Sequence, residues 1–188
     1  MKKGLFTYLS LIVTLCLFLP PPASAQTYWS GTSTQDWTGS GTESDPYLIT
    51  TAEQLAGLSK AVQEGRDFKG EFIRLGNDLW LSNPSAPHEE KPQWTPIGGI
   101  THKIGDSQWD YRVDTTFFRG NFDGGDFHIY NLYYNTLPDM SDWDDPFGSG
   151  AIDFNGWYKA MFGYLEGGSI KNLHLVNDTI IGAADVAG

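Results

Sequence analysis

An internal repeat is the feature that most constrains how this chain can fold. Residues 129–134 (Ile-Tyr-Asn-Leu-Tyr-Tyr) match residues 170–175 (Ile-Lys-Asn-Leu-His-Leu) position by position, at an offset of 41 residues. A double glycine precedes each copy. Glycine corners followed by short strands are typical of solenoids, in which equivalent positions of successive coils lie over one another. The repeat therefore predicts that Ile129 stacks on Ile170.

The asparagines of the two copies, Asn131 and Asn172, are expected to form a structural ladder in which each amide bonds to the next coil. These patterns predict an all-β fold: a fragment of a right-handed parallel β-helix (solenoid) with one N-terminal capping α-helix. A β-sandwich is the alternative, because glycine-turn-strand units also occur in other all-β domains. Antiparallel pairing of the two copies, or their separation into different sheets, would favour the sandwich.

One helix is predicted, over residues 51–64. Thr51 is a suitable N-cap residue, Gln54 completes a capping box, and Gly65 supplies the C-terminal stop. Three apolar residues then form a single stripe at helical spacing, which favours a helix lying over an apolar core. These residues are Leu55, Leu58 and Val62.

Short strands are predicted at residues 47–49, 71–75 and 78–81, where apolar and β-branched residues are bounded by glycine, asparagine or proline. Residues 99–115 are polar and are predicted to form a loop. Short strands between tight turns agree with a composition of 22 glycines and seven tryptophans.

Residues 1–25 have the pattern of a cleavable signal peptide. Lys2 and Lys3 precede an apolar run, and Ala23-Ser24-Ala25 supplies the small residues of a cleavage site. We therefore expect an exported protein, secreted or at the cell surface, with no membrane span in the mature chain. The alternatives are a membrane anchor and lipid attachment at Cys16, the one cysteine of the chain.

Three regions follow from these patterns. Residues 1–25 form the signal peptide, residues 26–66 an N-terminal segment with the capping helix, and residues 67–188 the coils of the solenoid. The coils stop at Gly188 without a capping pattern, which predicts that the chain is truncated.

Charge and motifs exclude several classes of function. The formal net charge of −11 becomes −13 when Lys2 and Lys3 leave with the signal, which argues against nucleic acid and anionic membranes as partners. The mature chain has no cysteine for disulfides or thiol chemistry, and its four histidines lack the spacing of a zinc site. No nucleophile elbow or Walker motif occurs. The sequence predicts no enzymatic activity and no cofactor.

An acidic insert is the candidate metal site. Its carboxylates could supply hard oxygen ligands to calcium, although the spacing of an EF-hand is missing, and a solvated acidic loop is the alternative. The residues are Asp139, Asp142, Asp144 and Asp145.

Three tryptophans in polar segments are candidate glycan-binding residues, because flat indole rings beside carboxylates and amides suit sugar rings. They are Trp109, Trp143 and Trp157, and the alternative is that they cover the core. Asp123 and Asp126 resemble an acid pair, but their place in a Gly-Gly turn favours a structural role.

The segment from Gly41 to Leu58 resembles the opening of secreted bacterial proteins with glycine-rich GLUG repeats, and residues 94–98, 118–124 and 161–173 are similar to their later coils. The resemblance implies a strand and capping helix before a parallel β-helix, in proteins described as adhesin-like. It also implies a relation to the non-catalytic repeats of IgA-type metallopeptidases. The H-E-x-x-H motif of the peptidase is incomplete here, since Pro92 stands where its second histidine is required.

Together these observations predict a non-catalytic secreted or cell-surface β-solenoid for adhesion or interaction, with a glycan or a host or surface protein as partner. The alternative is a carbohydrate-binding module or the remnant of a β-helix enzyme that acts on polysaccharides.

Overall fold

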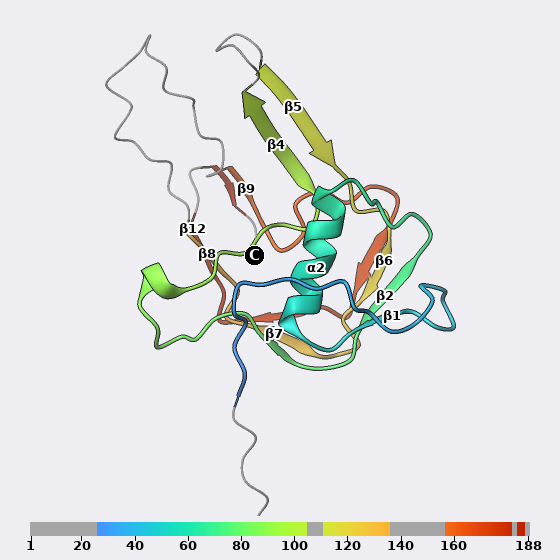
Figure 1. Ribbon diagram of the computed structural model, residues 1–188, viewed down its shortest axis with the longest axis horizontal. Helices are drawn as coiled ribbons and strands as arrows, with labels where there is room; N and C mark the ends of the chain where they lie inside the picture. The colour runs from blue at the N-terminus through green and yellow to red at the C-terminus, as the bar shows by residue number, and fades with distance from the viewer. Residues whose placement is uncertain (1–25, 105–110, 136–156, 182–183, 187–188) are drawn as a thin grey trace, which may run out of the picture.

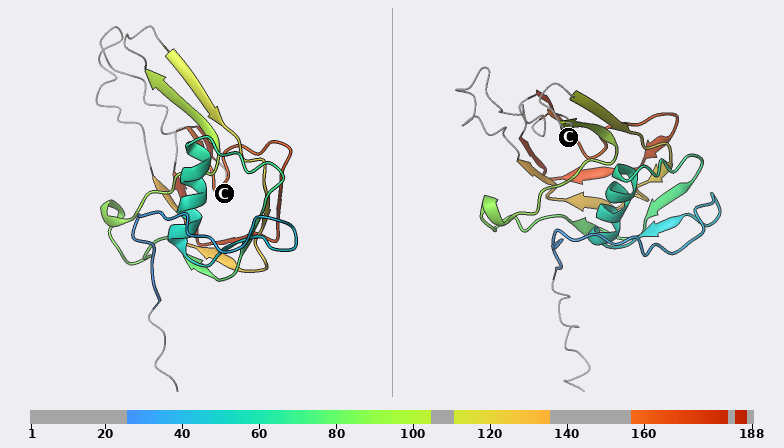
Figure 2. Two further views of the ribbon diagram at one scale, coloured as in Figure 1. Left: turned by 45° about the vertical axis from the view of Figure 1, so that its right-hand side comes forward. Right: turned by 45° about the horizontal axis from the view of Figure 1, so that its top comes forward.

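The computed structural model describes residues 26–104, 111–135, 157–181 and 184–186. In this part of the chain, short strands predominate and one α-helix is present, so the fold belongs to the all-β class (Figure 1). Strands far apart in the sequence lie side by side, and in Figure 2 the chain rises through successive tiers from cyan and green to orange and red. No helix in these ranges is long and apolar enough to cross a bilayer.

Among the described residues, four of the five sheets are parallel. The largest has the order β1-β2-β6-β10 and the next has the order β11-β7-β3, followed by the pairs β12-β8 and β13-β9. The strands are β1 (Tyr47–Ile49), β2 (Phe72–Leu75), β3 (Leu79–Trp80), β6 (Asn121–Asp123), β7 (His128–Tyr130), β8 (Tyr133–Asn135), β9 (Trp157–Lys159), β10 (Ser169–Lys171), β11 (His174–Val176), β12 (Thr179–Ile181) and β13 (Ala184–Val186).

The register of these sheets aligns apolar side chains in rows that form the core. Ile73, Phe122 and Ile170 occupy neighbouring positions on β2, β6 and β10. Leu79 and Ile129 do the same on β3 and β7, and both are almost fully buried. Because alternate residues of a strand point to opposite faces, the intervening residues lie on the outer surface.

The predicted stacking of the two repeat copies is wrong. Ile129 lies opposite Leu175, whereas Ile170 lies opposite Phe122 in another sheet. The pairing offsets are thus 46 and 48 residues rather than 41. Ile129 and Ile170 thus lie in different sheets, although the end of the second copy, Leu175, pairs with the start of the first. Every one of these pairings is parallel, whereas a β-sandwich is built from antiparallel sheets.

The predicted asparagine ladder is also wrong. The Asn131 amide donates to the carbonyl of Ser82, and the Asn172 amide donates to the carboxylate of Asp123. Both residues follow a three-residue strand and have positive φ angles of 57° and 52°, as Asn177 has at 58°. Asparagine adopts this left-handed conformation more readily than most residues. The shared I-x-N-L pattern therefore marks one type of corner, used at different places in the fold.

Helix α2 (Ala52–Gln63) confirms the predicted helix and its caps. The Thr51 side chain accepts from the Gln54 N–H, and the Gln54 side chain accepts from the Thr51 N–H. At the other end, the Gly65 N–H donates to Val62 O and the Arg66 N–H donates to Ala61 O, as in a Schellman motif. The predicted apolar stripe is buried, and Leu55 and Leu58 are at most 1% exposed.

The helix is covered on both sides. Its Ser59 hydroxyl donates to the carbonyl of Thr95 at 2.7 Å, which ties the helix to the backbone of that segment. On the opposite side, the backbone of Thr34 crosses so close to Gly57 that a Cβ atom there would collide with the Thr34 carbonyl. Figure 1 shows α2 running across the strands beneath the blue N-terminal segment.

Residues 99–115, predicted as a loop, contain an antiparallel hairpin that extends from the rest of the fold (Figure 1). It consists of β4 (Gly99–Ile104) and β5 (Tyr111–Thr116). The β-branched residues Ile100, Ile104 and Val113 lie between the polar ones, and this content favours strands despite the polar composition. A short 3₁₀ helix, η1 (His88–Glu90), occupies the proline-rich segment before it.

Candidate functional site

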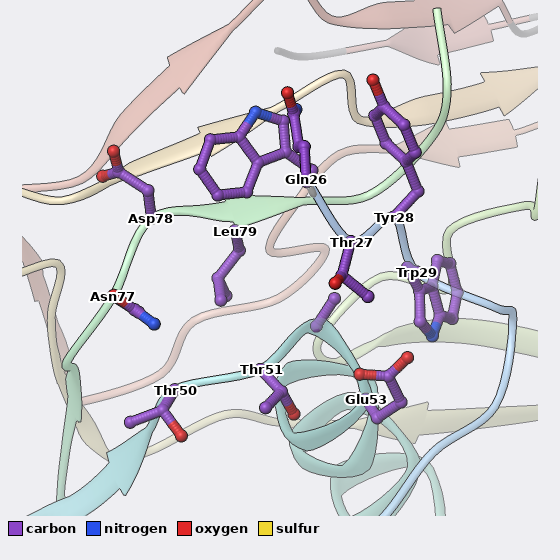
Figure 3. Close-up of a pocket in the computed structure, with 12 residues that line it drawn as sticks. Gln26, Thr27, Tyr28, Trp29, Thr50, Thr51, Glu53, Asn77, Asp78 and Leu79 are labelled. Carbon is purple, nitrogen blue, oxygen red and sulfur yellow. The ribbon is translucent and has the colours of Figure 1, made fainter. Parts of the chain in front are cut away.

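A hollow opens where the N-terminal segment, the start of α2 and the turn before β3 meet. Figure 3 shows the labelled side chains of residues 26–29, 50, 51, 53 and 77–79 around it. The hollow has a volume of about 580 Å³. Its lining combines aromatic rings with hydroxyl, amide and carboxylate groups, which is the composition of a site that orients a polar ligand.

A second hollow of about 440 Å³ adjoins the first and shares Gln26, Tyr28 and Trp80 with it. Beyond Trp80 it is lined by the corner residues Asn131 and Asn177, among others. We refer to the two hollows together as the Trp80 groove. Its further lining residues include Ser82, Lys91, Tyr130 and Tyr133.

Trp80 lies at the centre of this groove and is held on one face. The residues on either side of Trp80, Leu79 and Leu81, are buried, so that Trp80 projects outward from β3 and is half-buried. Tyr130 stacks against it with ring centres 5.2 Å apart and planes inclined by 7°. The backbone N–H of Trp29 donates to the Trp80 carbonyl at 2.9 Å, which fixes the backbone of Trp80.

The second face of the indole borders the groove. β3 is the last strand in its sheet order, so no further strand of that sheet places a ring over Trp80. Among the described residues, Tyr130 is the one aromatic residue stacked on it. An aromatic face held rigidly from behind and open in front can stack with a flat or weakly polar ligand surface.

The first hollow also has polar groups free to bind a ligand. No described residue forms a hydrogen bond with the side chains of Gln26, Tyr28 or Asn77. Two carboxylates accompany them. Asp78 accepts the His128 N–H at 2.8 Å, and Glu53 accepts from Ser30 at 3.4 Å.

The ring stack continues along the outer face of the sheet. His128 lies 5.7 Å from Tyr130 and 5.1 Å from His174, measured between ring centres. Each histidine has a carboxylate nearby: Asp78 is 3.6 Å from His128 Nδ1, and Asp126 is 4.0 Å from His174 Nε2. The outer face thus presents a row of four planar rings beside the groove.

Lys91 and Tyr133 border the second hollow. The Lys91 ammonium lies 5.2 Å from the centre of the Tyr133 ring and 3.4 Å from the Pro84 carbonyl. His88 also packs against Tyr133, with its Nδ1 atom 3.1 Å from the phenol oxygen. The charge at this end of the groove is therefore positive, opposite to that of the first hollow.

Asp123 has a structural role. Burial alone would raise its pKa, but hydrogen bonds from the Gly125 N–H and the Asn172 amide, with the charges of Lys171 and Arg74, outweigh burial and lower the pKa. Asp126 is exposed and has a φ of 63°. The Asp123 carboxylate thus stabilises the tight turn that follows β6, and Asp126 is a left-handed residue of that turn.

The candidate residues named from the sequence lie largely outside the described residues. This holds for Trp109 and Trp143, and for the candidate calcium ligands Asp139, Asp142, Asp144 and Asp145. The backbone of Trp157 is described, in β9 opposite Ala184. In the described ranges, no group of three or more His, Cys, Asp or Glu residues could hold a metal ion. The glycan and calcium assignments remain predictions.

The groove residues Tyr28 and Trp80 were not among those candidates. A signal for Trp80 exists in Asp78-Leu79-Trp80-Leu81, where polar or aromatic residues alternate with leucine. That alternation places the indole on the outer face of a strand. Tyr28 carries no comparable signal, because its position depends on where the N-terminal segment meets β3.

Comparison with known proteins adds one relative. The chain is 27% identical over 153 residues to a protein of Evansella cellulosilytica named "Putative Gly-rich membrane protein". The match covers 80% of this chain and 13% of the relative, so the chain spans a small part of that protein's length. No family model matches the chain. No solved structure matches it either.

The name of this relative corrects one prediction. Residues 1–25 and the family resemblance predicted an exported protein, secreted or at the cell surface. The relative is named a membrane protein, which contradicts that location. The chain is thus similar over most of its length to one segment of a much longer glycine-rich protein.

Proposed function

We propose that this chain is a non-catalytic, right-handed parallel β-helix that serves as an interaction module and binds carbohydrate in the Trp80 groove. The open face of Trp80, supported from behind by Tyr130, is the observation that carries the proposal. Carbohydrate rings present flat C–H faces to aromatic side chains and hydroxyl groups to amides and carboxylates.

The β-helix part of the proposal is supported by the parallel pairing of strands from successive passes of the chain. β1, β2, β6 and β10 follow one another in one sheet, and β3, β7 and β11 follow one another in the next. Crossovers between parallel strands are right-handed in about 98% of cases. The resemblance to GLUG-repeat proteins agrees with this architecture and belongs to the same proposal.

The non-catalytic part is supported by the engagement of the groove carboxylates. Asp78 accepts the N–H of His128, and Glu53 lies in the first turn of α2, where a negative charge stabilises the helix. Asp123, one of the two residues that resemble an acid pair in the sequence, stabilises a turn by accepting the Gly125 N–H. Interaction with a surface protein is the second candidate from the sequence, but the lining of the groove favours a sugar.

A glycan array probed with the purified protein tests this proposal, followed by incubation with each glycan that binds. We expect binding to polysaccharide chains without release of new reducing ends or of unsaturated sugars. Absence of binding to every glycan on the array would contradict carbohydrate recognition. Release of products would instead assign an enzyme.

A further inference from the structure

The two ends of the Trp80 groove carry opposite charge. Glu53 and Asp78 line the hollow on one side of Trp80. Lys91 lines the hollow on the other side, where its ammonium is held over Tyr133. Gln26, Tyr28 and Trp80 line both hollows, so a ligand that passes over the indole meets both charged ends.

This arrangement discriminates against anionic chains. An anionic polysaccharide that reaches across Trp80 brings carboxylates or sulfates next to Glu53 and Asp78, and the single ammonium of Lys91 offsets only part of this repulsion. Like charges held together in a partly desolvated groove are unfavourable, and such repulsion is a common source of specificity.

The uncharged lining suits a neutral chain. Gln26 and Asn77 each offer an amide, which can both donate and accept, and Tyr28 offers a hydroxyl. These groups can act as hydrogen-bond donors or acceptors toward sugar hydroxyls. The carboxylates and the ammonium at the two ends can also accept from and donate to hydroxyl groups, without a compensating charge on the ligand.

We propose that the Trp80 groove selects neutral polysaccharide chains over acidic ones, an inference that rests on the proposed carbohydrate binding. The selection comes from Glu53 and Asp78. The indole of Trp80 supplies the affinity common to all chains.

The test compares chains that differ in charge alone. Titration calorimetry at physiological salt measures binding to three neutral polymers, a β-glucan, a mannan and a xylan, and to the carboxymethyl derivative of each. We expect at least one neutral polymer to bind and its carboxymethyl derivative to bind at least about tenfold more weakly. The E53Q/D78N variant should recover affinity for the carboxymethyl chain, whereas K91Q, the control, should not.

The outcomes separate the two proposals. If no polymer binds, neutral or charged, carbohydrate recognition itself fails. If the carboxymethyl derivative binds as tightly as its neutral parent, and Trp80→Ala abolishes the binding of both, recognition stands and the charge selection is overturned. Absence of recovery in E53Q/D78N, or recovery in K91Q, also overturns the selection. Circular dichroism of each variant establishes that the fold is intact.

Discussion

Tyr130 lies flat against Trp80, with ring centres 5.2 Å apart and planes inclined by 7°. The two residues are direct neighbours in the parallel register of β3 and β7, so both project from the same outer face. Such a pair contributes about 0.5–1.5 kcal/mol beyond the area it buries. Tyr130 therefore fixes the orientation of the indole before any ligand arrives, which lowers the entropic cost of binding.

Gly57 tests how tightly the N-terminal segment covers helix α2. Alanine is usually more favourable than glycine inside a helix by up to about 1 kcal/mol. At this position the added methyl would meet the Thr34 carbonyl, so we expect Gly57→Ala to destabilise the protein by about 1–3 kcal/mol. Thermal or urea unfolding measures the change.

Lys60→Ala is the matched control, because Lys60 is exposed on the same helix and forms a 3.9 Å ion pair with Glu64. Its unfolding free energy should change by less than about 0.5 kcal/mol. A Gly57→Ala protein as stable as the wild type would show that the segment does not press on the helix.

Asn131 tests the left-handed corner that replaces the expected ladder. Asn131→Leu should cost about 1–2 kcal/mol of conformational strain, besides the lost hydrogen bond to the Ser82 carbonyl. Asn131→Gly should cost less, because glycine adopts positive φ freely, although it loses the same bond. The difference in unfolding free energy between the two variants isolates the conformational part.

An equal loss of stability in the two variants would contradict this account of the corner. The same comparison at Asn172 should give the same order, since its φ is 52° and its amide donates to Asp123. Asn172→Leu is thus expected to destabilise, although leucine is more apolar.

Asp178 is expected to lower the stability of the protein at neutral pH. Its Oδ1 atom is buried and has no hydrogen-bond partner among the described residues, and burial raises its pKa above the ordinary 3.8 despite a bond from the Leu132 N–H. The ionised form is therefore disfavoured in the folded state. Asp178→Asn should raise the unfolding free energy by on the order of 1 kcal/mol at neutral pH. The gain is small because the carboxyl group is half-buried and solvent screens part of its charge.

The pH dependence gives the sign of this effect. Above the folded pKa, the wild type carries the full cost of a buried negative charge. As the pH falls through the folded pKa toward 3.8, the carboxyl becomes protonated in the folded state and the cost disappears. The advantage of Asp178→Asn should thus be largest at neutral pH and vanish in acid. An advantage that grows on acidification would contradict the assignment.

Local signals predicted local structure well. The capping box of Thr51 and Gln54 depends on contacts three residues apart, and it is present with the predicted partners. The stop at Gly65 is likewise a property of neighbouring residues. Such features depend almost entirely on the residues of a single helical turn, so a short stretch of sequence is enough to predict them.

Long-range register could not be predicted in the same way. The similarity of the segments at Asn131 and Asn172 reports a shared corner, whereas pairing depends on the length of every loop between the strands. Trp80 was missed for a related reason. Its outward direction follows from alternation with leucine, but its open face depends on the position of Tyr28 and on the absence of another strand beyond β3.

Calorimetric titration of the Trp80→Ala variant with a glycan that the wild-type protein binds tests the central claim most directly. Tyr164→Ala is the control, because Tyr164 is an exposed aromatic residue, 42% accessible, that is absent from the groove lining. We expect Trp80→Ala to weaken binding by at least about 2 kcal/mol, roughly 30-fold, with its fold retained, and Tyr164→Ala to bind like the wild type. Unchanged affinity in a folded Trp80→Ala protein, or an equal loss in Tyr164→Ala, would contradict the assignment of the Trp80 groove as the binding site.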